Sequence, residues 1–170
     1  MGKIRLIGSR NFIDRTKECL LLLREKDFMS YKVVIQNLRA IVENKVDIGL
    51  SYFDPFKEIP TAFMTKVCCE YDLKWYAAAL VHEAYHGKLF NDALMDNKNP
   101  LKEYCGYSAE MYCLTKQIEC LKKIGAREND ILYAIEHYDK KWWKDSSDEF
   151  NLIDCLNKIK LEKKYGDNWR

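Results

Sequence analysis

The stretch from Leu73 to Phe90 reads LKWYAAALVHEAYHGKLF and carries the most informative pattern of the chain. Asp72, directly before it, is a residue type that caps helices by accepting hydrogen bonds from free backbone N–H groups. The run Ala77–Val81 is entirely apolar, which is typical of a helix that is buried rather than exposed on one face. We therefore predict a buried helix over Leu73–Phe90.

Within this helix, residues 82–86 read His82-Glu83-Ala84-Tyr85-His86, the pattern H-E-x-x-H. The two histidines are four positions apart, so their side chains leave one helix face one turn apart. Two imidazoles placed in this way can bind one Zn²⁺. Glu83 neighbours the same face and can accept the proton of an attacking water. Because the chain has only three histidines, we interpret this pair as metal ligands rather than as hydrogen-bonded core residues.

A catalytic zinc site has three protein ligands and one open position, so a third ligand must come from elsewhere. Glu110 is predicted to lie on the inward face of a later helix, where a carboxylate requires a partner because burying an unpaired charge is costly. A zinc ion would be such a partner. Glu103, seven residues earlier and on nearly the same face, is the competitor and lies nearer a loop. We predict His82, His86 and Glu110 as the metal ligands.

The order of these residues resembles that of the gluzincins, zinc metallopeptidases of the zincin type. In this family an H-E-x-x-H helix is followed by a loop and by a second helix that carries a glutamate ligand. The resemblance covers roughly residues 62–124. It implies a small sheet above the active-site helix, with an edge strand that binds an extended peptide by strand addition. Ala62–Val67 would be that edge strand.

The resemblance also implies a role for each site residue. His82, His86 and Glu110 would bind Zn²⁺, and Glu83 would be the general base and acid in the hydrolysis of a peptide or protein substrate. Gluzincins further use a Tyr or His to stabilise the oxyanion, and the sequence leaves this assignment open among Tyr104, Tyr107, Tyr133, His137 and Tyr138.

Two other interpretations remain open from the sequence. The chain could be a zinc-stabilised binding or regulatory module without peptidase activity, in which a fourth protein ligand such as Cys105 or Cys113 closes the metal site. Alternatively, the H-E-x-x-H pattern could be accidental, which predicts no metal and ordinary hydrogen-bonded histidines.

The remaining pattern predicts short strands in the first 70 residues and helices afterwards, which is an α+β fold. We expect strands at Ile4–Ile7, Val46–Tyr52 and Ala62–Val67, and a loop between Pro55 and Pro60. We expect further helices from Asn11 to Lys26, over Tyr31–Val42, from Leu101 or Ser108 to Gly125, from a cap at Asn129, and over Ser147–Lys164, with a polar loop at Asn91–Pro100.

Together these elements predict one mostly helical, zincin-like domain over residues 1–170. Residues 1–90 would hold a small N-terminal sheet over the active-site helix, and residues 91–170 would be a helical part that contains the glutamate helix.

Composition argues against several classes of partner. The net charge of +2, from 28 basic and 26 acidic residues, is too balanced for a nucleic-acid-binding surface. A mean hydropathy of −0.43 and the lack of an apolar run near 18 residues predict no membrane-spanning helix. The seven cysteines include no C-x-x-C pair, and the first residues lack the apolar core of a signal peptide. We therefore expect a cytoplasmic protein with reduced thiols and with neither a nucleic-acid nor a membrane partner.

Overall fold

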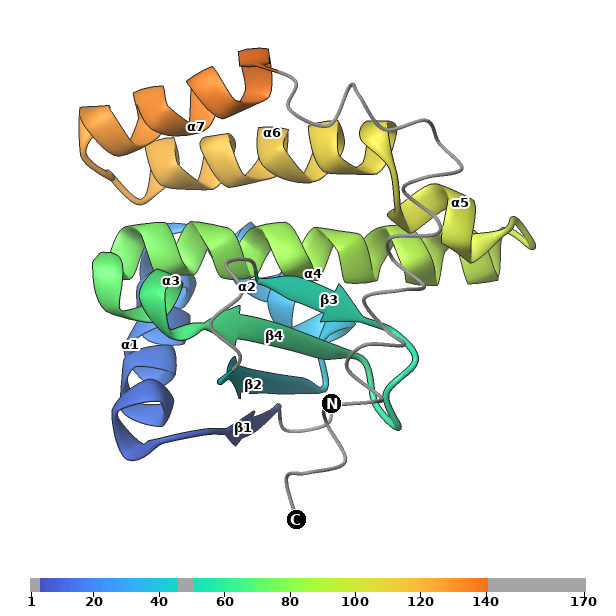
Figure 1. Ribbon diagram of the computed structural model, residues 1–170, viewed down its shortest axis with the longest axis horizontal. Coiled ribbons are helices and arrows are strands. Elements are labelled where there is room, and N and C mark those ends of the chain that lie inside the picture. Colours follow the sequence, from blue (N-terminus) through green and yellow to red (C-terminus); the bar gives the residue numbers. More distant parts are fainter. Residues whose placement is uncertain (1–3, 46–50, 141–170) are drawn as a thin grey trace.

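The computed structural model describes residues 4–45 and 51–140, with the backbone alone described at 137–140 (Figure 1). The fold is α+β and mostly helical, with four strands in the N-terminal half and only helices afterwards, as the sequence predicts. The elements in chain order are β1 (Arg5–Ile7), α1 (Arg10–Lys26), α2 (Phe28–Asn37), β2 (Ala40–Asn44), β3 (Tyr52–Asp54), β4 (Thr61–Thr65), α3 (Lys66–Tyr71), α4 (Leu73–Met95), α5 (Pro100–Tyr104), α6 (Tyr107–Lys123) and α7 (Glu128–Lys140).

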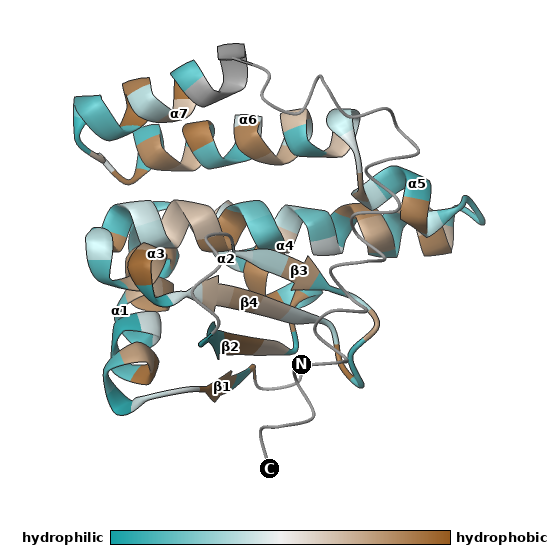
Figure 2. Ribbon diagram, in the orientation of Figure 1, coloured by the Kyte–Doolittle hydropathy of each residue, from teal (hydrophilic) through white to brown (hydrophobic). Residues whose placement is uncertain are grey.

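Helix α4 is the central element of the molecule. It contacts α1 and α2, the strands β3 and β4, and the helices α3, α5 and α6. In Figure 1 it runs between the sheet below and α6 above, and α7 covers the far side of α6. The core is built from the apolar faces of these layers, and Figure 2 shows hydrophobic residues along β2 and β4 and alternating with hydrophilic ones along α6. No helix of the described ranges is long and apolar enough to cross a membrane.

The sheet has the strand order β1-β2-β4-β3. The pairs β1–β2 and β2–β4 are parallel, whereas β3 runs antiparallel to β4, with Phe53 opposite Ala62. The edge strand beside the central helix is therefore β3, and the prediction that Ala62–Val67 forms this edge is wrong. The strand also ends earlier than predicted, at Thr65, because the Thr65 hydroxyl accepts a hydrogen bond from the Cys68 N–H and begins α3.

The predicted helix over Tyr31–Val42 is only half correct. Helix α2 ends at Asn37, and Ile41 lies in β2, where it pairs with Leu6 on one side and with Ala62 on the other. Helical spacing of apolar residues suggested a longer helix, but hydrogen bonds to two neighbouring strands and complete burial of Ile41 favour the extended conformation. Tertiary context commonly overrides local preference in this way.

Helix α4 begins as the sequence predicts. The Asp72 carboxylate accepts hydrogen bonds from the N–H groups of Lys74 at 2.8 Å and Trp75 at 3.2 Å. The helix continues beyond Phe90 to Met95, so the predicted loop at Asn91–Pro100 is mostly helical. One reason is that the Asn91 side-chain amide donates to Asn37 of α2 at 3.0 Å, which holds this extra turn against the core.

The other helix limits differ by one or two residues from those predicted. Ser9, not Asn11, caps α1 by accepting from the Phe12 N–H. Helix α7 begins at Glu128, so Asn129 lies within it. Gly125 follows α6 with a φ of 68°, a left-handed conformation suited to glycine after a helix end. The loop between Pro55 and Pro60 is confirmed.

Two predictions fall partly or wholly on residues that the structure does not describe. The strand predicted over Val46–Tyr52 is described only from Ser51 onward, and Tyr52 begins β3. The helix predicted over Ser147–Lys164 lies outside the described residues altogether.

We expect Asp72→Ala to lower the free energy of unfolding by about 1 kcal/mol, because two N–H groups at the start of α4 lose their acceptor. The matched control is Asp96→Ala at the opposite end of the same helix, where the carboxylate is mostly exposed and faces Lys98 at 3.2 Å. This control should change stability by less than about 0.5 kcal/mol. Urea denaturation followed by circular dichroism measures both. Equal losses in the two variants would contradict the capping role.

Candidate metal centre

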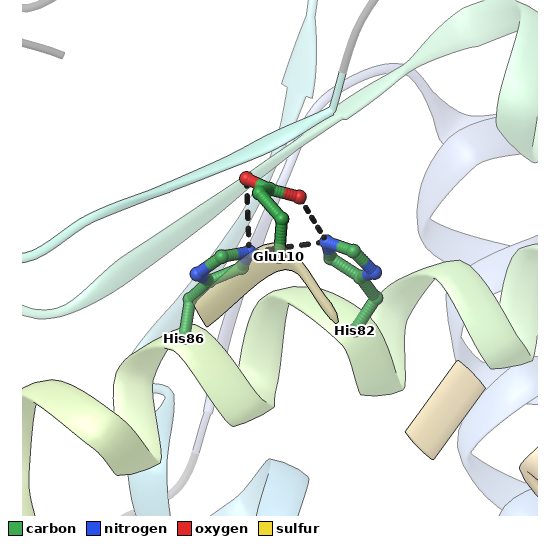
Figure 3. Close-up of side chains that lie close together, drawn as sticks. All are labelled: His82, His86 and Glu110. Atoms are coloured by element: carbon green, nitrogen blue, oxygen red, sulfur yellow. Dashed lines mark hydrogen bonds and ion pairs between the residues drawn. The ribbon is translucent and has the colours of Figure 1, made fainter. Parts of the chain in front are cut away.

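His82, His86 and Glu110 meet between the two central helices. The histidines leave α4 one turn apart, and Glu110 reaches them from the first turn of α6 (Figure 3). The Nε2 atoms of the two imidazoles lie 3.0 Å apart. The two carboxylate oxygens of Glu110 lie 3.4 Å from Nε2 of His82 and 3.5 Å from Nε2 of His86. The structure therefore brings together the three residues that the sequence predicts as ligands.

These separations fit a metal ion as the common partner. Donor atoms bound to a tetrahedral zinc at about 2.0–2.2 Å lie roughly 3.3–3.6 Å from one another. The distances from the two Nε2 atoms to Glu110, 3.4 and 3.5 Å, lie in this range but involve different carboxylate oxygens, and the 3.0 Å between the two Nε2 atoms is shorter. Nitrogen and carboxylate oxygen are also donor types that Zn²⁺ accepts. The donor types thus fit zinc, and one ligand atom from each residue lies within 4.8 Å of the other two.

Each imidazole is held differently at its other nitrogen. Nδ1 of His86 lies 2.8 Å from the backbone carbonyl oxygen of Tyr104, in a buried contact. Because a carbonyl oxygen only accepts, this contact requires the hydrogen on Nδ1, and in the neutral ring the lone pair is then on Nε2. Nδ1 of His82 is buried and has no hydrogen-bond partner among the described residues. Both ring nitrogens of His86 therefore have a polar contact that orients the ring, whereas His82 has such contacts only at Nε2.

The charge of Glu110 is stabilised by the histidines. Burial by itself raises the pKa of this carboxyl, but His86 and His82 beside it lower the pKa well below its ordinary value. The negative charge of Glu110 is therefore favoured by the two imidazoles beside it. Its side chain is 34% exposed, against 14% for His82 and 8% for His86, so solvent reaches the group from the side of Glu110.

Glu103, the competing third ligand, does not join the group. It lies exposed on α5, and the chain breaks its helical path at Gly106, where φ is 85°. Glu103 and Glu110 therefore belong to separate helices and do not share the face that continuous helical spacing suggested. Glu110 is the one that points towards the histidines (Figure 3).

A fourth protein ligand is not found in the part of the chain that the structure describes. Neither Cys105 nor Cys113 belongs to the group formed by the two histidines and Glu110. Cys113 is buried beside His86, and burial is the main cause that raises the pKa of its thiol. Three protein ligands with solvent access are the arrangement that leaves a metal position open.

Glu83 lies in α4 directly after His82 and is 6% exposed. Its charge contributes, after burial, to the raised pKa values of Cys68 and Cys113. The structure thus places Glu83 one position after the first predicted ligand and among the groups packed around α4.

The structure narrows the choice of an oxyanion-stabilising residue. Tyr104 is 4% exposed and its ring packs against Phe53 and Phe90, so it lies in the core. The ring of Tyr133 packs against that of Trp75, with 5.6 Å between the ring centroids. Trp75 lies about two helical turns before His82 on α4, so this contact holds Tyr133 away from the histidines. Tyr107, at the start of α6, remains a candidate.

The last two candidates, His137 and Tyr138, have side chains outside the described residues.

One contact of the site is not predictable from the sequence: the hydrogen bond from Nδ1 of His86 to the Tyr104 carbonyl oxygen. Every residue has a backbone carbonyl, so the residue type gives no indication of which one is used.

Comparison of the chain with family models, with curated proteins and with solved structures found no match. The functional argument therefore depends on the geometry of the site itself.

We expect the purified protein to bind one zinc ion per chain and to lose it when any of the three ligands is replaced, as in His82→Ala, His86→Ala or Glu110→Ala. The matched control is Glu103→Ala, which removes an exposed glutamate of α5 and should leave zinc binding unchanged. Elemental analysis after dialysis against metal-free buffer gives the stoichiometry, and circular dichroism reports folding. Zinc retained by the folded Glu110→Ala variant would rule out this ligand set.

Proposed function

We propose that this protein is a zinc-dependent metallopeptidase that hydrolyses peptide bonds of a peptide or protein substrate. The observation that carries the proposal is the convergence of His82, His86 and Glu110 on one point, with the buried Glu83 following the first histidine in the same helix. This constellation provides both a metal-binding group and a base, which are the two requirements of metal-assisted hydrolysis.

Each residue has a separate role in this mechanism. His82, His86 and Glu110 would hold the metal, which when bound makes water more acidic and polarises the carbonyl group of the substrate. Glu83 holds the attacking water by a hydrogen bond and accepts its proton as the oxygen adds to the carbonyl carbon. Glu83 then donates this proton to the nitrogen of the leaving amine, so that the base returns to its starting state.

The edge strand β3 supports an extended peptide as the substrate. Strand β3 is the edge strand of the described sheet and pairs with β4, and an edge strand is where an extended peptide can add to a sheet. It also contacts α4, the helix that carries the two histidines. We propose that the substrate lies along β3, which replaces Ala62–Val67 in this role.

The two other interpretations receive less support. A closed zinc site in a binding module requires a fourth protein ligand, and none of the described residues supplies one. An accidental H-E-x-x-H pattern predicts histidines with ordinary hydrogen bonds. Both nitrogens of His86 and Nε2 of His82 have such partners, but Nδ1 of His82 is buried without one in the described part of the chain.

We also propose that the protein acts in the cytoplasm. Six of its cysteines lie in the described ranges, and none of the six forms a disulfide there. Cysteines without disulfides are typical of a reducing compartment.

We expect Glu83→Gln to retain one zinc ion per chain and to lose hydrolytic activity by a factor of about 10² or more. The amide keeps the size of the side chain but cannot accept the proton. The matched control is Glu119→Gln, which changes an exposed glutamate on α6 that pairs with Lys116 at 2.9 Å, and it should remain fully active. The assay uses a library of fluorescence-quenched peptides with zinc-loaded protein.

Two results would contradict the proposal. Full activity of the Glu83→Gln variant would exclude Glu83 as the base. A zinc-loaded wild-type protein that cleaves no peptide of the library would favour the binding or regulatory module instead.

A further inference from the structure

The contact that orients His86 comes from outside the three-residue metal group. Nδ1 of His86 donates to the Tyr104 carbonyl oxygen at 2.8 Å, and this contact is buried. A hydrogen bond of this kind fixes the tautomer and the direction of a metal-binding imidazole. The position of the Tyr104 carbonyl therefore controls where Nε2 of His86 points.

The backbone around Tyr104 cannot secure this position by itself. Helix α5 spans only Pro100–Tyr104, which is far shorter than the length at which a helix is stable alone. Two residues later the chain reaches Gly106, whose φ of 85° ends the helical path. Tyr104 is 4% exposed, and the packing of its side chain, beside that of Leu101 and Cys105 against the core, helps to anchor this segment.

Two phenylalanine rings enclose the Tyr104 ring. Phe90 of α4 lies 5.5 Å from it and Phe53 of β3 lies 6.1 Å from it, both with an interplanar angle of 85°. The rings of Phe53 and Phe90 are themselves 6.5 Å apart in an edge-to-face arrangement. Contacts of this geometry are more favourable than burial of area alone. We call these three residues the aromatic cluster; it connects β3, α4 and α5.

The aromatic cluster lies next to His86 along the chain as well as in space. Phe90 is four residues after His86, and Gly87 directly follows it. A Cβ atom at Gly87 would lie 3.1 Å from the ring of Phe53 and 3.3 Å from the backbone oxygen of Asn37. The absence of a side chain at this position allows Phe53 to approach α4 closely enough to join the cluster.

We propose that Phe53, Phe90 and Tyr104 are positioning residues of the metal centre. Their aromatic cluster holds the Tyr104 carbonyl against Nδ1 of His86 and so directs Nε2 towards the metal. The inference rests on the metal centre of the proposed function, but it does not depend on peptidase activity. The three side chains act through His86, since none of them belongs to the ligand group.

The test measures the zinc dissociation constant of the full chain by competition with a chromophoric chelator. Phe90→Leu and Tyr104→Leu should each weaken zinc binding by about 10-fold or more, the effect usual for groups that orient a ligand. Tyr104→Phe keeps the aromatic ring and should weaken zinc binding by less than about threefold. The visible absorption bands of the Co²⁺-substituted protein should change in the two leucine variants, because these bands report ligand geometry.

The matched control is Phe12→Leu, the same substitution at a phenylalanine of the core outside the aromatic cluster. Phe12 is 2% exposed, belongs to α1 and packs against Tyr76 at 6.3 Å. The Phe12→Leu variant measures the general cost of losing an aromatic ring from the core. It should leave the zinc dissociation constant and the Co²⁺ absorption bands unchanged. If a leucine variant fails to fold, Phe53→Leu tests the same cluster from β3.

The outcomes separate this inference from the proposed function. Wild-type zinc binding together with unchanged constants and Co²⁺ bands in the cluster variants would overturn the positioning role alone. Equal weakening by Phe12→Leu would also overturn it, because the effect would then be one of general stability. A wild-type chain that binds no zinc would overturn both this inference and the metal centre.

Discussion

The packing of α4 against α6 is the contact on which the candidate site depends. It places the carboxylate of Glu110 against two imidazoles of the neighbouring helix. Ala77, Ala78 and Ala84 of α4 are buried, and their small size allows neighbouring helices to approach. A carboxylate in such surroundings is costly unless it is paired. The two histidines, or a metal ion held with them, provide that compensation.

The elements around this interface each contribute one constraint to the site. The sheet supports α4 from one side and ends in the antiparallel strand β3, which contacts the same helix. The short helix α5 brings a backbone carbonyl to His86. Gly106 then redirects the chain, so that α6 begins beside α4 with Glu110 in its first turn. The site is thus assembled from segments that are close together only after folding.

Local signals in the sequence predicted some elements well and others poorly. The helix at Leu73 was predictable because its cap, Asp72, and its histidine spacing are local features. The strand β2 was not, since its Ile41 satisfies a helical pattern and becomes extended only through pairing with strands on both sides. The sequence also could not predict that β3 rather than β4 lies at the edge of the sheet. The order of strands in a sheet depends on contacts between segments far apart in the chain.

The sequence by itself determined that two histidines share a helix face with a glutamate directly after the first of them. It did so because helical geometry is set by spacing alone. Only the tertiary structure decided that Glu110 and not Glu103 completes the group, since the change of direction at Gly106 separates their helices. Only the tertiary structure could place the Tyr104 carbonyl at His86, because every residue has such a carbonyl and folding alone selects the one that is used.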